Sequence, residues 1–335
     1  MRPLVSRFIT LAQLMVLFWI GSSLSENYEV SKSIMLSFVT ASAVLATATL
    51  LRLPGFYASG AALGGRVTSL DVNPNAIGEI MAEGAVALIG LHISRALRFG
   101  KTTLLLSIPL LILLVQTGSR AAISGFVIGS SVYLLLIWRS KRKLWSVGLA
   151  ALGLVALIYI VSADPLTLER IRSSYYQGDV SGRDTIFSAA VKMIQDRPIF
   201  GWHPIELWYQ LGLRVGTWER DAHNLFLHLL LEVGLVGTLP FLIGLGLCVW
   251  AAWKASAGNL GLVFLALLLT LLVNNLAGTG LATKSFWLIL ALAVGAAGGV
   301  NNHRRQLSVL RKVHTSLQSS IKEAPLPQAT RVFRI

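Results

Sequence analysis

The sequence predicts an all-α polytopic membrane protein, and three of its features support that prediction. Of its 335 residues, 54% are hydrophobic and only 13% are charged, and the mean hydropathy is +0.68. A soluble domain normally carries more charge than this. The apolar residues gather into long runs, and about 20 such residues suffice to cross a hydrocarbon core roughly 30 Å thick. The polar residues, by contrast, concentrate in one long connection between two of the runs.

We count about nine apolar segments that are long enough to span a bilayer. They lie at 3–21, 33–51, 76–94, 102–118, 120–138, 143–162, 223–253, 260–280 and 284–300. The seventh is longer than one crossing needs, and Gly234 and Gly237 predict a bend within it. No small-residue cleavage site follows the first segment, so we expect a retained span rather than a removed signal peptide.

These segments divide the chain into four parts. We expect N-terminal transmembrane helices at 1–162, an extracytoplasmic loop at 163–222, C-terminal transmembrane helices at 223–300 and a basic cytoplasmic tail at 301–335. The tail ends with Pro325 and Pro327, and we expect it to be largely disordered and to touch anionic lipid.

The orientation follows from the basic residues of the short connections, which the positive-inside rule places in the cytoplasm. With nine spans these residues fall on one side, and the long loop falls on the other. The same count places Arg2 and Arg7 outside, which conflicts with the rule. The basic residues of the short connections are Arg95, Arg98, Lys101, Arg139, Lys141, Arg142, Lys143 and Lys254.

The long loop contains one clear local element, an amphipathic helix. Ser181 and Asp184 form an S-x-x-D capping pattern, and Pro198 ends the helix. Such a helix lies on the membrane surface or over the bundle. A solvated helix packed on its own bundle explains the pattern equally well. The residues expected on its apolar side are Ile186, Phe187, Ala190, Val191 and Ile194.

Composition also limits the chemistry. The net charge of +14 has no soluble basic domain to carry it, so we expect membrane lipids and a phosphate-bearing lipid substrate as partners, and no nucleic acid. The single cysteine, Cys248, excludes an internal disulfide. No D-x-D, H-E-x-x-H, G-x-S-x-G or Walker motif is present, which disfavours metal hydrolases, serine hydrolases and ATPases. We therefore predict no metal and no cofactor.

Arginines near the ends of spans are the first candidates for substrate binding. Arg120 lies in TGSRAAISG between the fourth and fifth segments, and Arg183 opens the amphipathic helix in SGRD. A guanidinium stays charged at any biological pH and forms bidentate bonds with phosphate. The alternative is that each arginine pairs with a loop carboxylate or extends to lipid head groups. Secondary candidates in the same loop are Arg172, Arg214 and Arg220.

His223 is the candidate catalytic residue. It opens the seventh segment in the sequence DAHN, with Asp221 before it and Asn224 after it. An imidazole can act as a base near neutral pH, and a nearby carboxylate can hold its tautomer. The alternative is a helix cap without chemistry. Three carboxylates lie within predicted spans, where such groups face a cavity or a partner or hold helices together: Glu79, Glu83 and Glu232.

Four segments together resemble the O-antigen ligase/polymerase superfamily, which includes O-antigen ligases of lipopolysaccharide, Wzy-type polymerases and related exopolysaccharide polymerases. The segments are DVNPNAIG at 71–78, TGSRAA at 117–122, SGRDTIFSAAVKMIQDRPIFGW at 181–202 and AHNLFLHLLLEVGLVG at 222–237. They follow the family's order, and the resemblance covers roughly residues 66 to 300.

The resemblance implies a metal-independent glycosyltransferase in the bacterial inner membrane, with its active face extracytoplasmic. The donor would be a glycan on a polyprenyl diphosphate such as undecaprenyl diphosphate, and the acceptor a hydroxyl of a glycan, of lipid A core or of another molecule. Arg120 and Arg183 would hold the diphosphate, and His223 would serve the acceptor hydroxyl. The resemblance leaves ligase and polymerase both open.

The alternative function is a transporter or flippase for an anionic lipid-linked glycan. Transporters often show internal repeats and broken helices at matched positions. We find no convincing repeat, and the polar residues cluster at one membrane face, which favours the enzyme. Arginines gathered in one outer cavity would support transfer, whereas a trail of arginines across the bilayer would support transport.

Overall fold

The structure, a computed structural model, describes residues 2–60, 63–96, 100–134, 158–177, 183–216 and 221–323. In these ranges the chain forms helices and no β-strand, and an isolated antiparallel bridge joins Ala58 to Thr68. Five of the described helices are long and apolar enough to cross a membrane, and two further apolar helices are shorter. The all-α membrane class is thereby supported, while the count of nine spans stays a prediction.

The helices follow the predicted segments closely. The first half forms α1 (Arg2–Leu24), α2 (Tyr28–Leu50), α3 (Pro74–Ile93), the 3₁₀ helix η2 (Gly100–Leu106), α4 (Ser107–Gln116) and α5 (Arg120–Ser131). The second half forms α8 (Pro165–Gln177), α9 (Arg183–Asp196), α10 (Pro204–Val215), α11 (Leu225–Ala255), α12 (Val263–Asn274), the 3₁₀ helix η3 (Gly280–Ala282) and α13 (Lys284–Glu323). Most of the sixth predicted segment lies outside the described residues.

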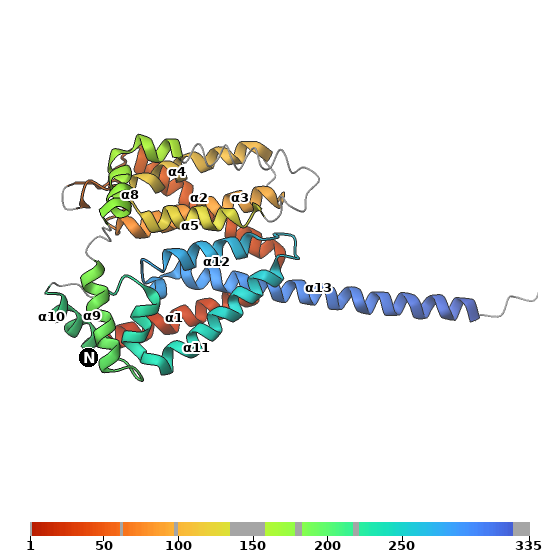
Figure 1. Cartoon of the computed structure of the whole chain (residues 1–335). Helices are drawn as coiled ribbons and strands as arrows, with labels where there is room; N and C mark the ends of the chain where they lie inside the picture. Colours follow the sequence, from red (N-terminus) through yellow and green to blue (C-terminus); the bar gives the residue numbers. More distant parts are fainter. Residues whose placement is uncertain are drawn as a thin grey trace, which may run out of the picture.

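The helices form two packed groups that α12 joins. Helices α2, α3, α4 and α5 pack together, and α13 packs against α1 and α11 (Figure 1). Helix α12 contacts both groups, through α5 and α3 on one side and through α11 and α13 on the other. The N-terminus lies beside α9 and α10, whereas α13 extends out at the opposite end (Figure 1). We call the end that carries α8, α9 and α10 the loop end.

Two glycines bring α5 close to α12. A Cβ atom built at Gly129 would lie 2.9 Å from the carbonyl oxygen of Ala266, and one at Gly125 would lie 3.1 Å from that of Thr270. Small residues spaced by four let membrane helices approach closely and pack well. This packing fixes the N-terminus of α5, and with it Arg120, beside the C-terminal end of α12.

The predicted bend in the seventh span is present at Gly234. This residue interrupts α11 with φ 58° and ψ −164°, and a side chain there would collide with the carbonyl oxygen of Ile199. Unpaired backbone groups are costly inside a membrane, and here the segment 198–203 supplies their partners. The four backbone bonds are Trp202 N to Leu231 O (2.7 Å), His203 N to Glu232 O (3.2 Å), Leu235 N to Pro198 O (2.9 Å) and Val236 N to Ile199 O (3.1 Å).

The described parts of the loop 163–222 are largely helical, and α9 and α10 pack on the bundle. Helix α9 contacts α10 and α11, and its buried residues are Ile186, Ala189, Ala190 and Met193. Val191, predicted on the apolar side, is 47% exposed, because the helix turns its Ala189–Met193 side toward its neighbours. The position of α9 at the membrane surface stays a prediction.

The expected disorder of the tail is wrong over residues 301–323, because α13 continues to Glu323. Helix nucleation is the costly step, and here the spanning part of α13 has already provided it. The Arg, Lys, Leu and Gln residues of this stretch favour continuation of the helix, and Pro325 cannot continue it. Residues 324–335 lie outside the described residues.

Candidate functional site

Four arginines from four separate segments gather at the loop end: Arg66 before α3, Arg120 at the start of α5, Arg170 in α8 and Arg183 at the start of α9. We call them the arginine cluster. Burial, together with the positive charges of the other three guanidinium groups, lowers the pKa of Arg66 to about 10. The cluster is therefore a place where positive charges repel one another and a negative charge is favoured.

The turn 117–120 holds three of these arginines together. Arg66 Nε donates to the carbonyl oxygen of Thr117 (2.6 Å), and Arg170 Nε donates to that of Gly118 (3.2 Å). Arg120 Nη1 in turn donates to the main-chain oxygen of Arg170 (3.0 Å). Gly118 has φ +59°, and a Cβ there would lie 3.4 Å from the side chains of both Arg66 and Arg170. Glycine is needed at this position for its conformation and for the space it leaves.

The segment 71–78 supports this turn from α3. Asn75 Oδ1 accepts a hydrogen bond from Arg66 Nη2 at 2.5 Å. Gly78 packs so closely that a Cβ there would lie 3.0 Å from Ser119 Cβ. Ser119 caps α5, where its side chain accepts from Ala122 N (3.4 Å). The segments 71–78 and 117–122, which were noted in the sequence, thus pack against each other beside the arginine cluster.

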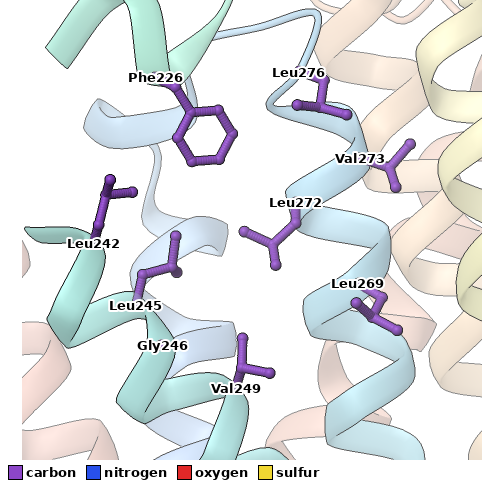
Figure 2. Close-up of a pocket in the computed structure, with 9 residues that line it drawn as sticks. All are labelled: Phe226, Leu242, Leu245, Gly246, Val249, Leu269, Leu272, Val273 and Leu276. Carbon is purple, nitrogen blue, oxygen red and sulfur yellow. The ribbon is translucent and has the colours of Figure 1, made fainter. Parts of the chain in front are cut away.

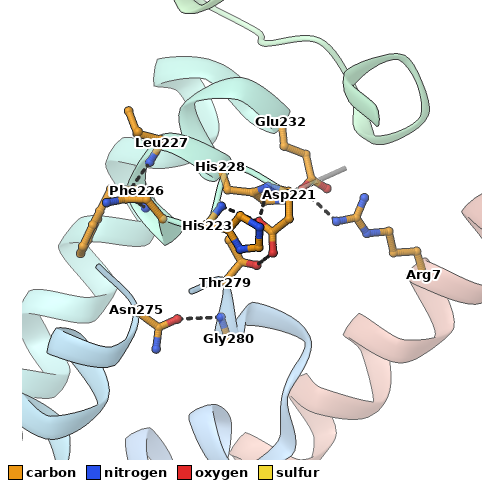
Figure 3. A network of polar contacts seen from close by, with 11 residues as sticks. Arg7, Asp221, His223, Phe226, Leu227, His228, Glu232, Asn275, Thr279 and Gly280 are labelled. Carbon is orange, nitrogen blue, oxygen red and sulfur yellow. Dashed lines mark hydrogen bonds and ion pairs between the residues drawn. The ribbon is translucent and has the colours of Figure 1, made fainter. Parts of the chain in front are cut away.

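A second polar group surrounds the start of α11 (Figure 3). It consists of Arg7, Asp221, His228, Glu232 and Thr279, and we call it the histidine network. His228 Nε2 lies 3.0 Å from Glu232 Oε2, and His228 Nδ1 lies 3.7 Å from Asp221 Oδ1. Glu232 Oε2 also accepts from Arg7 Nη2 at 3.1 Å. The Thr279 hydroxyl donates to Asp221 Oδ2.

The histidine network fixes the turn that carries His223. The main-chain N–H of His223 donates to Asp221 Oδ1 (3.0 Å), and the residue has φ 47°, which is uncommon for a side chain other than glycine. The next residue, Asn224, caps α11 by accepting from Phe226 N (3.0 Å) and Leu227 N (3.1 Å). Its Nδ2 donates to Leu276 O (3.0 Å). Both the oxygen and the nitrogen of the Asn224 side chain are therefore used in hydrogen bonds that stabilise the fold.

The arginine cluster and the histidine network are linked through α3. Gly78 packs against Ser119 in the turn of the arginine cluster. The adjacent Glu79 extends the other way, and a Cβ built at Gly278 would lie 3.1 Å from its Oε1. Gly278 directly precedes Thr279 of the histidine network. Contacts between neighbouring residues therefore connect segments 71–78, 117–122 and 222–237 at the loop end.

An apolar cavity of about 290 Å³ lies between α11 and α12, next to this turn (Figure 2). Phe226 and Leu276, two of its lining residues, flank the hydrogen bond from Asn224 to Leu276 O. The other lining residues, apart from Gly246, are aliphatic: Leu242, Leu245, Val249, Leu269, Leu272 and Val273. The cavity can take a hydrocarbon group at the edge of the site.

The structure brings the main predicted residues to one end of the bundle and separates some of the secondary ones. Arg120 and Arg183 share the arginine cluster, and Glu232 belongs to the histidine network. Arg172 is exposed on α8. Arg214 pairs with Asp196 at 3.1 Å and lies over the ring of Trp202, so the loop accounts for its charge. Arg220 lies outside the described residues.

Sequence reasoning missed four residues of the site: Arg66, Arg170, Arg7 and His228. For Arg7 the sequence did offer a signal, because its position on the outer side conflicts with the positive-inside rule. Arg7 pairs with Glu232 and lies 5.1 Å from the ring centre of Trp208. The positive charge of Arg7 at the loop end is thus balanced by a carboxylate of the protein. Among the described residues, no group of three or more His, Cys, Asp or Glu is arranged to hold a metal ion.

In a comparison with protein families, residues 105–242 match the sequence model of the O-antigen ligase family, Wzy_C. No curated protein matches the chain. The matched range contains Arg120, Arg170, Arg183 and His223, whereas Arg66 precedes it. The match confirms the resemblance inferred from the four sequence segments.

Proposed function

We propose that the protein is a metal-independent membrane glycosyltransferase, an O-antigen ligase or a polysaccharide polymerase, and the match of residues 105–242 to the O-antigen ligase family supports this proposal. It moves an oligosaccharide or polysaccharide from a polyprenyl-diphosphate carrier to an acceptor hydroxyl. It works in the bacterial inner membrane, at the extracytoplasmic face. The acceptor is a glycan, lipid A core or another hydroxyl-bearing molecule.

The observation that carries the proposal is the gathering of Arg120 and Arg183 in one cluster at the loop end. Guanidinium groups bind diphosphate oxygens in bidentate fashion, and the N-terminus of α5 adds the positive end of a helix dipole beside Arg120. These groups stabilise the charge that develops on the departing diphosphate, which is the kind of electrostatic help a metal gives in other transferases.

His223 serves the acceptor. The acceptor oxygen attacks the anomeric carbon, the bond from that carbon to the phosphate oxygen breaks, and its electron pair leaves with the diphosphate. The proton of the acceptor hydroxyl passes to the His223 ring and then to solvent. The Asp221 bond to the His223 main chain (3.0 Å) holds the turn in place, so the ring is oriented before the acceptor arrives.

The apolar cavity supports a lipid-linked donor. It begins at Phe226 and Leu276, beside the turn that carries His223. Its lining offers hydrocarbon contacts to the first units of an isoprenoid chain.

The rival function is transport of a lipid-linked glycan without bond formation. The break in α11 at Gly234 favours it, since transporters use broken helices. Yet backbone groups of 198–203 fill this break, and the four cationic groups gather at one end of the bundle rather than along it. Both facts favour transfer over transport.

The test is incubation of purified protein with a defined lipid-diphosphate oligosaccharide and a panel of hydroxyl acceptors. Mass analysis should find the oligosaccharide on one acceptor and polyprenyl diphosphate released. Movement of the intact donor between the leaflets of a vesicle, with no new glycosidic bond, would favour the transporter instead.

A further inference from the structure

Glu79, in α3, is a carboxylate at the loop end that the proposed mechanism does not use. It is partly buried, and among the described residues it forms no hydrogen bond or ion pair with another group. A carboxylate within a membrane bundle is costly, and such groups usually face a partner or a substrate path. Because the described part of the chain supplies no partner, Glu79 points to a ligand.

On one side, Glu79 adjoins the arginine cluster. The residue before it, Gly78, packs so closely on the turn of that cluster that a Cβ there would lie 3.0 Å from Ser119 Cβ. One helical turn before Glu79, Asn75 Oδ1 accepts a hydrogen bond from Arg66 Nη2 at 2.5 Å. Side chains four residues apart lie on the same side of a helix, about 6 Å apart along its axis. The Glu79 carboxylate is therefore about one turn deeper in the bundle than the Arg66–Asn75 pair.

On the other side, Glu79 adjoins the histidine network. A Cβ built at Gly278 would lie 3.1 Å from Glu79 Oε1. The next residue, Thr279, donates through its hydroxyl to Asp221 Oδ2, and Asp221 Oδ1 accepts the main-chain N–H of His223 at 3.0 Å. Glu79 thus lies beside the segment that holds the His223 turn in place.

The proposed reaction places a sugar between these two groups. The anomeric carbon is bonded to the diphosphate before transfer and to the acceptor oxygen after it, so the transferred sugar ring lies between the diphosphate site and the acceptor site. Glu79 lies in that interval, between Arg66 and the segment that holds the His223 turn. Both oxygens of a carboxylate accept hydrogen bonds, and hydrogen bonds to an ionised acceptor are the stronger kind. The hydroxyls of a sugar ring are donors that suit such a group.

We propose that Glu79 binds the transferred sugar, the ring attached directly to the diphosphate, by accepting hydrogen bonds from its hydroxyls. This inference rests on the proposed function and names the residue that recognises the sugar within that site. Positive charge develops on the ring as its bond to the diphosphate breaks, as in glycoside cleavage, and the nearby carboxylate stabilises that charge. Glu79 is therefore a catalytic residue that also selects the sugar.

The experiment measures binding of two kinds of probe to the purified full-length protein in detergent. The first is farnesyl diphosphate capped with a methyl group, and the second is farnesyl diphosphate that carries one hexose or N-acetylhexosamine. Both are diphosphate diesters with the same charge, so their difference in affinity reports the sugar alone. At least one sugar-bearing probe should bind roughly tenfold more tightly than the methyl-capped one, as expected for a hydrogen bond to a charged group.

Variants assign this sugar preference to Glu79. Glu79→Ala should abolish the preference, and Glu79→Asp, whose carboxylate lies one carbon further back, should weaken it, while affinity for the methyl-capped probe stays unchanged. Glu83→Gln is the matched control and should keep the preference, because Glu83 lies one turn deeper on the same helix and is only 1% exposed. A sugar probe without the recognised hydroxyl should lose affinity for the wild type but not for Glu79→Ala, since both changes remove the same contact.

Absence of any sugar preference in the wild-type protein would overturn the inference, and so would a preference that survives Glu79→Ala. Loss of affinity for both kinds of probe in Glu79→Ala and Glu79→Asp would show that Glu79 supports the fold, which also contradicts the inference. The transfer assay is read separately. Glycan transfer without a preference that depends on Glu79 removes only this inference, whereas the preference without any transfer removes the proposed function and leaves a sugar-binding site.

Discussion

The two polar groups at the loop end arrange their charges in opposite ways. The arginine cluster places like charges together, anchored mainly to carbonyl oxygens of the turn 117–120. The histidine network instead places its polar groups in a chain, from Arg7 to Glu232, to His228 and to Asp221, in which the carboxylate of Glu232 faces the cation of Arg7. The first arrangement gains from an added anion, and the second is balanced within the protein.

This difference separates binding from positioning. His228 and Glu232 are only 5% and 8% exposed, so their side chains interact with each other and with Arg7 rather than with a ligand in solution. The role of the histidine network is therefore to hold the turn of His223 in place, through the bond from the His223 main chain to Asp221. We infer that the arginine cluster supplies affinity for the donor and that the histidine network supplies the geometry of the acceptor side.

The largest expected effect comes from breaking the arginine cluster at its two proposed ligands. Arg120→Ala and Arg183→Ala should each lower the transfer rate by roughly a hundredfold or more, because a charged transition-state contact is worth about 3 kcal/mol. Lysine at either position should restore only part of the rate, since it lacks the bidentate fork. Steady-state kinetics on correctly inserted protein would measure this, and full activity of Arg183→Ala would refute the assignment.

A comparable loss, of a different kind, is expected for the acceptor side. His223→Ala should lower kcat by about a hundredfold, which is typical for removal of a general base. Donor affinity should change little, because the arginine cluster remains intact. Binding and turnover measured on the same preparation separate the two effects, and a large loss of donor affinity would show that His223 belongs to the donor site.

A smaller effect, on stability, should follow from breaking the histidine network. Glu232→Gln leaves Arg7 and His228 without their shared carboxylate, and loss of one partner of a largely buried pair costs about 3 kcal/mol. Thermal unfolding in detergent should show a Tm lower by several degrees. Adding Arg7→Gln to this variant should cost less than Arg7→Gln alone. Additive losses would mean that the pair is not coupled.

The pH dependence of anion binding sharpens the comparison further. Because burial and neighbouring cations lower the pKa of Arg66 to about 10, the folded protein loses this proton at a lower pH than the unfolded chain does. As the pH rises past about 10, the unfolded chain therefore binds more protons than the folded protein, so this group favours folding increasingly. Diphosphate binding moves the opposite way and should weaken as pH passes about 10. Titration of Arg66→Gln should lack this step.

The smallest expected effect is that of a chelator. If cations of the arginine cluster neutralise the diphosphate, transfer should proceed at an unchanged rate in EDTA. A strict requirement for magnesium or manganese, restored on adding the ion back, would mean that the guanidinium groups do not suffice.

Sequence patterns predicted the parts of the site that depend on local order, and they missed those that depend on tertiary contact. Arg120 could be identified because it lies between two spans with almost no loop to hold it. Arg170 and Arg172 lie in the same short helix, and only packing against Gly118 selects the first. Arg66 follows a glycine-rich stretch and lies in none of the four motifs, and its partners Thr117 and Asn75 come from two other segments.

The fold shows the same division. Hydrophobic runs placed most of the helices within a few residues, and Gly234 marked the bend in α11. The partner of that bend, the segment 198–203, could not be predicted, because its four backbone bonds join a loop to a span that follows it only later in the sequence. The glycine that breaks a membrane helix can be recognised in the sequence, but the segment that pairs with the broken backbone cannot.

The central claim is that the arginine cluster holds the donor diphosphate during glycan transfer. The most direct measurement is a single-turnover reaction in vesicles that quantifies the glycosylated acceptor and the released polyprenyl diphosphate together, for wild-type protein and for Arg183→Ala. We expect equal amounts of the two products from the wild type, and a loss of both by about a hundredfold in the variant. Release of diphosphate without a glycosylated acceptor, or equal product from the variant, would contradict the claim.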